Sequence, residues 1–489
     1  MSGASTPTIR HWYLVAPATA VLWILFKCCY PYADFFTDSY TYIQAAVDHD
    51  AISYRPIGYS LFLRLVHGVS RSDTFLVTIQ FLLVQSSCWV LFRVVCRRCA
   101  PGPWVQVLIA AFLMLNPLVY YISNFVSSDA LFIALSLFWL TSLMQSMDAP
   151  TWRGSVIQWI LLLMIFYTRY VALFYPVVAA ICYCWLRRDW WFRLTAMAGS
   201  VAIVAAGVLH TRELTQAETG VSTFSAFSGW QMANNALHLY PWLPVDSTGL
   251  PPVTLPLAGD VDRYFSREGV ALKKNPVGAT TAYMWERSSP LHEYFDAYRR
   301  PHSNLRQGRD TAQLSYFTAW NRVAPVFSEY GYSLLRRHPQ AFCRYYLWPS
   351  AGSFVLSPLD VLGTYLDGKK EIDPIARDWF GYRTVRPWVC SATVQGTICA
   401  PFPWLSLVLT VAFGVVASFF VLKGELRDRY PAFTRCLRVA GVYLGVNICF
   451  NVFASSSVYR YQVLPLILLF IFTCCGFFFV IYRKQSSHV

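Results

Sequence analysis

The sequence predicts an all-α protein that crosses a membrane several times. Of its 489 residues, 56% are hydrophobic and only 13% are charged, whereas about a quarter of a soluble domain is charged. Aromatic residues reach 17%, which suits a chain with two membrane–water interfaces, where Trp and Tyr gather. The mean hydropathy of +0.39 is too low for a bundle made only of spans. A sizeable polar region is therefore expected as well.

Long apolar runs mark the expected membrane spans. A helix needs about 20 mostly apolar residues to cross the hydrocarbon core, and the sequence contains about ten such runs. Because lipid offers the backbone no hydrogen-bond partners, each run is expected to be helical. The fifth and sixth runs are short and nearly continuous. The expected spans are 12–29, 74–95, 104–121, 128–147, 155–169, 171–186, 194–210, 403–422, 438–455 and 462–482.

The loops between the runs predict the orientation of the bundle. Basic residues follow the second, sixth, eighth and tenth runs, all on one side, and the positive-inside rule makes that side cytoplasmic. The net charge of +14 is explained by this topology. No nucleic-acid partner is expected, because no basic run interleaves with aromatic residues in a polar segment. The basic residues are Arg93, Arg97, Arg98, Arg187, Arg188, Arg193, Lys423, Arg427, Arg429, Arg435, Arg438, Arg483 and Lys484.

The predicted topology divides the chain into three parts. Residues 1–210 form an N-terminal module of about seven spans, with a first outer loop at 30–73. Residues 211–402 form a large, mostly helical extracytoplasmic region. Residues 403–489 form a C-terminal module of about three spans and a cytoplasmic tail.

Several outer segments have helical spacing of apolar residues. Asp38–Val47 and Pro56–Val69, in the first outer loop, are expected to be helices on the membrane surface. In the large region, Tyr316–Phe327 is amphipathic. Tyr330–Leu347 and Ala351–Tyr365 are apolar enough to touch the membrane, either as interfacial helices or as a re-entrant pair.

Three acidic residues are candidates for catalysis. Asp34 and Asp38 are four residues apart, so a helix through both would place them on one face. A carboxylate at a membrane surface can act as a general base toward a hydroxyl group, although Asp38 could equally be the N-cap of a helix. Asp129 opens an apolar run without a cationic neighbour in sequence. It is either another N-cap or an acid placed at membrane depth for function.

Three arginines are candidates for binding an anion. Arg169 and Arg460 lie in outer turns, where the positive-inside bias disfavours positive charge, and each is followed by a tyrosine, Tyr170 and Tyr461. The planar guanidinium fork suits phosphate oxygens. The alternative is that these side chains extend to the interface without a ligand. Arg55 is a third candidate near the same surface.

Most of the cysteines fall in apolar runs. Cys28 and Cys29 belong to the first run and are expected to be small buried hydrophobic residues. Cys390 and Cys399 both lie in the large outer region, where a disulfide between them is one alternative if that side is oxidising.

Four short motifs occur in the order and topology of a known enzyme superfamily. Asp38-Ser39-Tyr40-Thr41-Tyr42 looks like an Asp-Glu-x-x-Tyr signature, with Ser39 in the place of Glu, and Ser127-Ser128-Asp129-Ala130-Leu131-Phe132 resembles Thr-Glu-x-x-Phe. Tyr167-Thr168-Arg169-Tyr170 and Arg460-Tyr461-Gln462 resemble later basic turns. Together they resemble the GT-C superfamily of membrane glycosyltransferases, which includes protein O-mannosyltransferases and the aminoarabinose transferase of lipid A.

The resemblance implies a GT-C-like fold and an enzyme of cell-envelope glycan biosynthesis. Such an enzyme transfers a hexosyl or pentosyl group from a polyprenyl-phosphate donor, with inversion, to a glycan, lipid or protein acceptor. The site would lie on the periplasmic face of a bacterial inner membrane, among membrane lipids. Asp38 would be the general base, and either Asp34 or Asp129 the second carboxylate. A divalent metal, Mg²⁺ or Mn²⁺, is left open, and the donor would be bound by Tyr42, Arg55, Arg169, Tyr170, Arg460 and Tyr461.

Two other functions remain compatible with outer arginines. A transporter or flippase of lipid-linked sugars would share the cationic site but would need no acid in the first loop. The sequence shows no internal repeat of the kind common in transporters. An O-antigen polymerase or ligase would also use outer arginines, but the Asp38 region favours the GT-C type.

Overall fold

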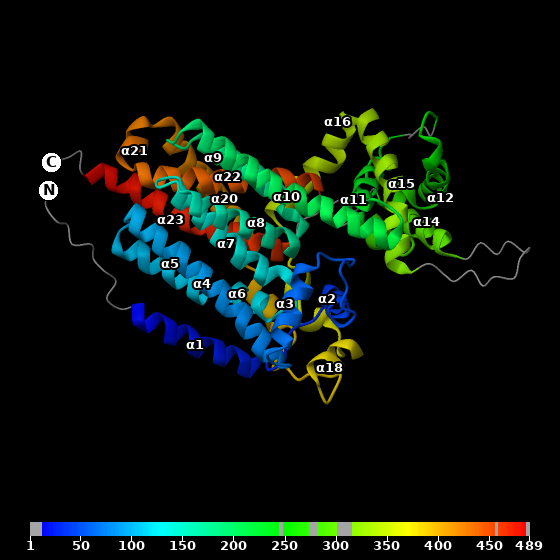
Figure 1. Ribbon diagram of the computed structural model, residues 1–489, viewed down its shortest axis with the longest axis horizontal. Coiled ribbons are helices and arrows are strands. Elements are labelled where there is room, and N and C mark those ends of the chain that lie inside the picture. The colour runs from blue at the N-terminus through cyan, green and yellow to red at the C-terminus, as the bar shows by residue number, and fades with distance from the viewer. Residues whose placement is uncertain (1–11, 244–247, 273–280, 301–314, 455–457, 486–489) are drawn as a thin grey trace, which may run out of the picture.

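The computed structural model describes residues 12–243, 248–272, 281–300, 315–454 and 458–485. Every regular element in these ranges is a helix (Figure 1), which confirms the all-α prediction. Seven helical segments are long and apolar enough to cross a membrane. The chain is therefore a multi-pass membrane protein.

The seven long segments coincide with predicted spans. Three further apolar helices are shorter and lie where the first, fifth and sixth spans were expected, so a total of ten spans stays a prediction. The long segments are α4 (Asp73–Cys99), α5 with α6 (Pro103–Leu115, Pro117–Asn124), α7 (Ser128–Ser146), α10 (Trp190–Thr219), α19 with α20 (Val394–Cys399, Phe402–Leu422), α22 (Pro431–Ala454), and η6 with α23 (Tyr459–Gln462, Val463–Gln485). The shorter ones are α1 (Trp12–Cys29), α8 (Trp152–Thr168), and η1 with α9 (Tyr170–Phe174, Tyr175–Cys184).

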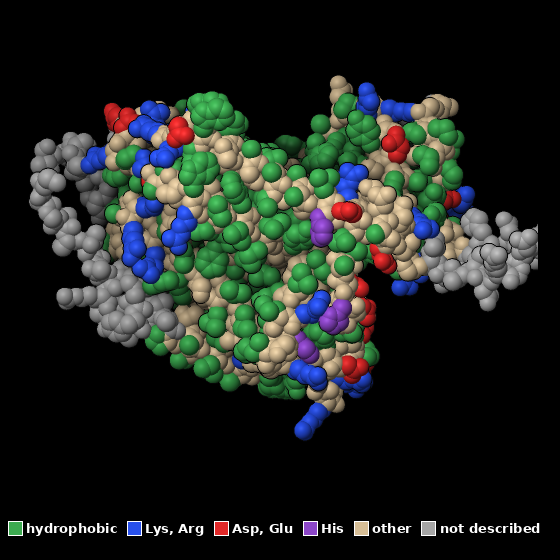
Figure 2. All heavy atoms as spheres, viewed as in Figure 1, with side chains coloured by type: hydrophobic (Ala, Val, Ile, Leu, Met, Phe, Trp, Pro, Cys, Tyr) green, Lys and Arg blue, Asp and Glu red, His purple; other side chains and the backbone are tan. Residues whose placement is uncertain are grey.

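The loops that carry most of the basic residues meet at one end of the bundle. Asp148, after α7, forms ion pairs with Arg98 at the end of α4 and with Arg435 near the start of α22. The short helix α21 (Gly424–Arg429) lies at this end, and the large polar region lies at the other (Figure 1). Figure 2 shows hydrophobic side chains over the middle of the bundle and Lys and Arg near the α21 end. By the positive-inside rule this end would be the cytoplasmic one, which stays a prediction.

The first outer loop forms the two expected helices, α2 (Thr37–Val47) and α3 (Gly58–His67). Gly58 allows α3 to approach the end of α8, because a Cβ atom there would lie 2.5 Å from the carbonyl oxygen of Tyr167. Since α2 begins at Thr37, Asp34 lies before the helix, and the prediction of one helical face for Asp34 and Asp38 is wrong. Asp38 is not the N-cap either, because Phe36 occupies that position.

The large region packs around its own aromatic core. The rings of Trp230 and Trp320 stack with centroids 3.7 Å apart, and this core joins α11 to α15. The elements between α10 and the short helix η3 are α11 (Ala226–Leu237), η2 (Pro252–Thr254), α12 (Leu255–Leu272), α13 (Ala282–Trp285), α14 (Pro290–Arg299), α15 (Tyr316–Arg337) and α16 (Pro339–Phe342).

Prolines divide the two apolar segments that were expected to touch the membrane. The segment 330–347 is split at Pro339, and the segment 351–365 loses its helix before Pro358, because proline lacks the N–H group that a helix requires. The carbonyl of Pro358 accepts a hydrogen bond from the Tyr459 amide at 2.8 Å, which ties this segment to the start of the last span. The elements here are η3 (Cys343–Leu347), α17 (Trp348–Val355), η4 (Asp360–Gly363), η5 (Tyr365–Gly368) and α18 (Pro374–Phe380).

Candidate functional site

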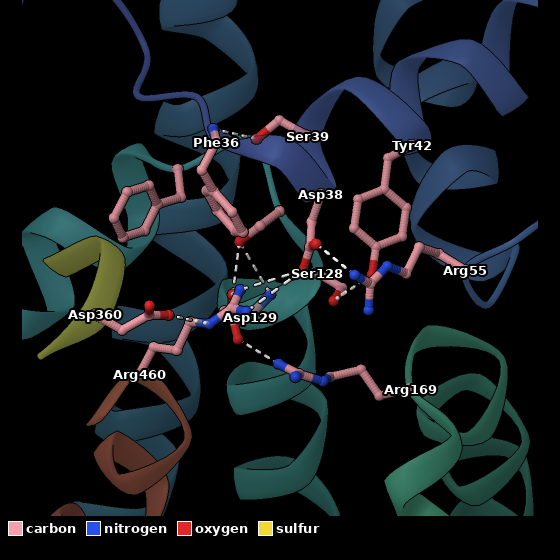
Figure 3. Close-up of polar contacts among 12 residues, drawn as sticks. Phe36, Asp38, Ser39, Tyr42, Arg55, Ser128, Asp129, Arg169, Asp360 and Arg460 are labelled. Atoms are coloured by element: carbon pink, nitrogen blue, oxygen red, sulfur yellow. Dashed lines mark hydrogen bonds and ion pairs between the residues drawn. The ribbon is translucent and has the colours of Figure 1, made fainter. Parts of the chain in front are cut away.

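Five charged residues from five separate segments of the chain meet in one place (Figure 3). We call them the charged cluster: Asp38, Arg55, Asp129, Arg169 and Arg460. They come from α2, the segment before α3, the start of α7, the turn after α8, and the turn before α23. All five were singled out in the sequence, and the fold brings them into one network of ion pairs.

Asp129 is the buried anchor of the charged cluster. Its side chain is only 2% exposed and forms ion pairs with Arg169 and, at 3.4 Å, with Arg460. Ser127 is the N-cap of α7, and its hydroxyl donates to the Asp129 carboxylate at 2.8 Å. A buried carboxylate is tolerated only when it is paired and hydrogen-bonded. Asp129 therefore holds the two guanidinium groups in position.

Asp38 is the more exposed of the two acids, with 14% of its side chain accessible. Its carboxylate oxygens lie 2.5 Å from a terminal nitrogen of Arg55 and 3.4 Å from one of Arg460. Arg460 thus bridges Asp38 and Asp129, although Asp38 and Arg460 are 422 residues apart in the chain. Asp38 is the carboxylate that faces accessible space.

Aromatic rings fix the planes of the arginines. The Tyr461 ring centroid lies 4.2 Å from the guanidinium carbon of Arg169 and 4.8 Å from that of Arg460. The Phe36 ring lies 4.7 Å from Arg460, and the Phe227 ring lies 4.9 Å from Arg55. Such cation–π contacts favour a fixed guanidinium orientation.

Tyr42 lies beside the charged cluster and connects α2 to α7. Its hydroxyl donates a hydrogen bond to the hydroxyl of Ser128 at 2.9 Å. The side chain is buried, and burial raises the pKa of its phenol. Tyr42 is therefore a neutral hydroxyl group at the wall of the site.

Two cavities meet at the charged cluster. One, of about 170 Å³, is lined by Asp38, Arg55 and hydroxyl groups, and the other, of about 290 Å³, is mostly apolar. Arg169, Tyr170 and Arg460 line both cavities. The apolar cavity includes Phe132, Ile133, Leu173, Tyr443, Phe450 and Leu464, which come from α7, η1, α22 and α23. The site therefore presents an apolar chamber and a polar chamber with cations in the wall between them.

Two guanidinium N–H groups in the charged cluster have no acceptor within the described residues. They are the buried Nε atoms of Arg55 and Arg460. The Arg460 Nε lies 3.9 Å from the nearest carboxylate oxygen of Asp360, which is too long for a hydrogen bond. A buried donor without an acceptor is costly. Both N–H groups are therefore suited to donate hydrogen bonds to the oxygens of an anionic ligand.

Asp34 lies apart from the charged cluster. Its carboxylate accepts the amide of Leu366 at 2.8 Å, and its backbone exchanges hydrogen bonds with Asn124 and Val126. The side chain is 2% exposed, and this burial raises its pKa well above the usual range. Asp34 ties the first outer loop to the α6–α7 turn and to η5, so its contacts support a structural role.

We expect Asp34→Asn to preserve the fold and to make its stability less dependent on pH. The folded-state pKa of Asp34 is raised, so its contribution to stability is full at low pH and is lost as pH rises through that pKa. Asparagine cannot ionise, and its amide oxygen can still accept the Leu366 amide. The unfolding midpoint in detergent, followed between about pH 5 and 8, should fall less for the variant than for the native chain. A variant less stable than the native chain at the upper pH would show that the ionised carboxylate is required.

Sequence interpretation missed several neighbours of the charged cluster. Asp360, whose carboxylate lies 3.9 Å from Arg460, is the single acidic residue in the apolar stretch 351–365. That isolation was a usable signal, because charge is rare in segments near a membrane. Phe36 and Phe227 carried no such signal, since aromatic residues are common throughout this chain.

The donor set of the site does not fit a divalent metal. In the described parts of the chain, no three His, Cys, Asp or Glu side chains are placed to hold a metal ion. The carboxylates of Asp38 and Asp129 are each paired with arginines instead. No chemical step is therefore assigned to Mg²⁺ or Mn²⁺.

No protein-family model, no curated protein and no solved structure matches this chain. The interpretation of the site therefore depends on its own geometry.

Proposed function

We propose that this protein is a membrane glycosyltransferase that moves a sugar from a polyprenyl-phosphate donor to a hydroxyl group at the outer membrane face. The observation that carries the proposal is the position of Arg169 and Arg460 in the wall between an apolar cavity and the polar cavity of Asp38. An amphiphile with an apolar chain, a phosphate and a polar head matches this order of environments.

The apolar cavity suits the lipid part of the donor. It is lined by side chains from α7, η1, α22 and α23, so a chain could reach the cluster from between the spans. The phosphate would then lie against the arginines, where the Nε groups of Arg55 and Arg460 lack acceptors among the described residues. Charge–charge interactions are stronger at a buried site than in water. The sugar would project into the polar cavity toward Asp38.

The chemistry assigned to the site is a single displacement with inversion. The acceptor hydroxyl enters the polar cavity, gives its proton to the Asp38 carboxylate and attacks the anomeric carbon. The bond between that carbon and the phosphate oxygen breaks, and polyprenyl phosphate leaves with an additional negative charge. Arg460 and Arg55 stabilise this charge as it develops, while Asp129 keeps Arg460 and Arg169 oriented.

The cellular setting follows from the same proposal. The site lies at the end of the bundle opposite the basic loops, which supports an extracytoplasmic position under the positive-inside rule. The periplasmic face of a bacterial inner membrane is the setting proposed for it, with a glycan, lipid or protein as the acceptor.

Purified protein in liposomes provides the direct test. Labelled polyprenyl-phosphate sugars with hexosyl and pentosyl heads would be supplied together with an extract of envelope glycolipids and glycans. We expect release of polyprenyl phosphate and appearance of the label in an acceptor for at least one donor, with protein-free liposomes as the control. Movement of the intact donor across the bilayer without cleavage would contradict the proposal and favour a flippase.

A further inference from the structure

Two cysteines that are far apart in the sequence lie side by side at the outer end of α1. Cys29 is the last residue of α1, and Cys390 lies in the segment before α19. The amide of Cys390 donates a hydrogen bond to the carbonyl of Cys29 at 3.1 Å. Their side chains are also close enough to interact.

The backbone contact gives a spacing that suits a disulfide. Disulfides join residues whose Cα atoms lie roughly 4.4 to 6.8 Å apart, and the direct backbone hydrogen bond holds Cys29 and Cys390 close together. Both residues are exposed, so an oxidant can reach them. Cys29 is thus not the buried small residue that its apolar run predicted.

The other candidate partner of Cys390 is placed differently. Cys399 is the last residue of α19 and is fully buried, whereas Cys390 is exposed. Among the described residues, Cys390 is joined to Cys29 by a backbone hydrogen bond, and the two side chains interact. The burial of Cys399 and the backbone contact of Cys390 favour Cys29 over Cys399 as the partner of Cys390.

We propose that Cys29 and Cys390 form a disulfide that fastens the outer end of α1 to the large extracytoplasmic region. The oxidant is the disulfide of a thiol–disulfide oxidoreductase or of oxidised glutathione. One cysteine thiolate attacks that disulfide and forms a mixed disulfide, and the other thiolate then displaces the oxidant's second sulfur. The protein loses two electrons and two protons, and the oxidant is reduced to its two thiols.

The crosslink would reinforce the framework beside the site. Next to Cys390, the Tyr30 hydroxyl contacts the Ser391 carbonyl at 3.5 Å, and the Ala392 carbonyl accepts the Tyr365 amide at 2.8 Å. The neighbouring Leu366 amide holds Asp34. A disulfide at Cys29 would therefore fix the segment that connects α1 to α2. Asp38 lies in the first turn of α2. This inference does not depend on the reaction that the site performs.

Peptide mapping of the full-length protein tests the pairing. Protein purified without reductant would be exposed to oxidised glutathione, treated with an alkylating reagent, digested and analysed by mass spectrometry. We expect a linked pair of peptides that contains Cys29 and Cys390 and that disappears after reduction. Complete alkylation of both residues after oxidation, or a link between Cys390 and Cys399, would overturn the proposal.

Matched variants separate the crosslink from a general effect of cysteine loss. Cys29→Ser should free the Cys390 thiol for alkylation, and Cys390→Ser should free Cys29. Cys28→Ser, which removes the adjacent exposed cysteine, should leave the link intact. Reductant should also lower the unfolding midpoint of the native chain but not that of Cys29→Ser. An equal shift in both proteins would contradict a stabilising link at this position.

Discussion

Asp38→Asn should lower the rate of sugar transfer by at least about 100-fold, the lower range for loss of a general base. The amide has nearly the shape of the carboxylate, and its oxygen can still accept from Arg55, which lies 2.5 Å from the Asp38 carboxylate. It cannot take up the proton of the acceptor hydroxyl. The effect should therefore appear in kcat rather than in the KM for the donor, measured as initial rates of polyprenyl phosphate release.

The matched control for this variant is Asp48→Asn, at the other end of α2. Asp48 is the C-cap of that helix and contacts Gln44 at 2.6 Å, away from the charged cluster. Its replacement should leave transfer within about twofold of the native rate, since surface changes of this kind have small effects. Native activity in Asp38→Asn would exclude Asp38 as the base and would direct attention to Asp129.

Much of the membrane architecture could be predicted because hydropathy is a local property. Each long helix of the bundle falls on an apolar run, and the three runs without a long helix are those with the shortest apolar helices. The number of spans is harder to predict, because the length of an apolar helix does not by itself separate a short span such as α8 from a buried helix. In the segments 330–347 and 351–365, the helices are interrupted at or before a proline. The overall apolar composition of each segment nevertheless favoured a single helix.

The members of the charged cluster could be predicted for a different reason. Ionisable groups at the ends of spans are rare and conspicuous, so Asp129, Arg169 and Arg460 stood out individually. Which of the charged residues pair with one another could not be predicted, because an ion pair such as that between Arg460 and Asp38 joins positions 422 residues apart. Asp34 was grouped with Asp38 by spacing. The start of α2 and the hydrogen bond from the Leu366 amide to the Asp34 carboxylate both depend on tertiary packing. The spacing of residues in the sequence does not encode that packing.

Arg460→Lys should reduce kcat/KM for the donor by about 100-fold, the loss expected when a preorganised donor to a developing anion is removed. Lysine retains the positive charge but not the planar fork, whose nitrogens reach Asp38 and Asp129, each at 3.4 Å. It also lacks the Nε group that has no acceptor among the described residues. A point charge cannot hold both acids and a phosphate in one fixed geometry. Initial rates at several donor concentrations would measure the change.

Because lysine keeps the positive charge, Arg460→Lys tests the geometry of the guanidinium contacts and not the neutralisation of the phosphate charge. Arg386→Lys is the matched control: Arg386 is exposed and pairs with Glu371 in the large region, so its replacement should leave kcat/KM unchanged. An unfolding midpoint close to that of the native chain would show that any loss in Arg460→Lys concerns the site itself. If Arg460→Lys transferred sugar at the native rate, a need for the guanidinium group in stabilising the phosphate would be excluded, and the fork would serve only to join Asp38 to Asp129.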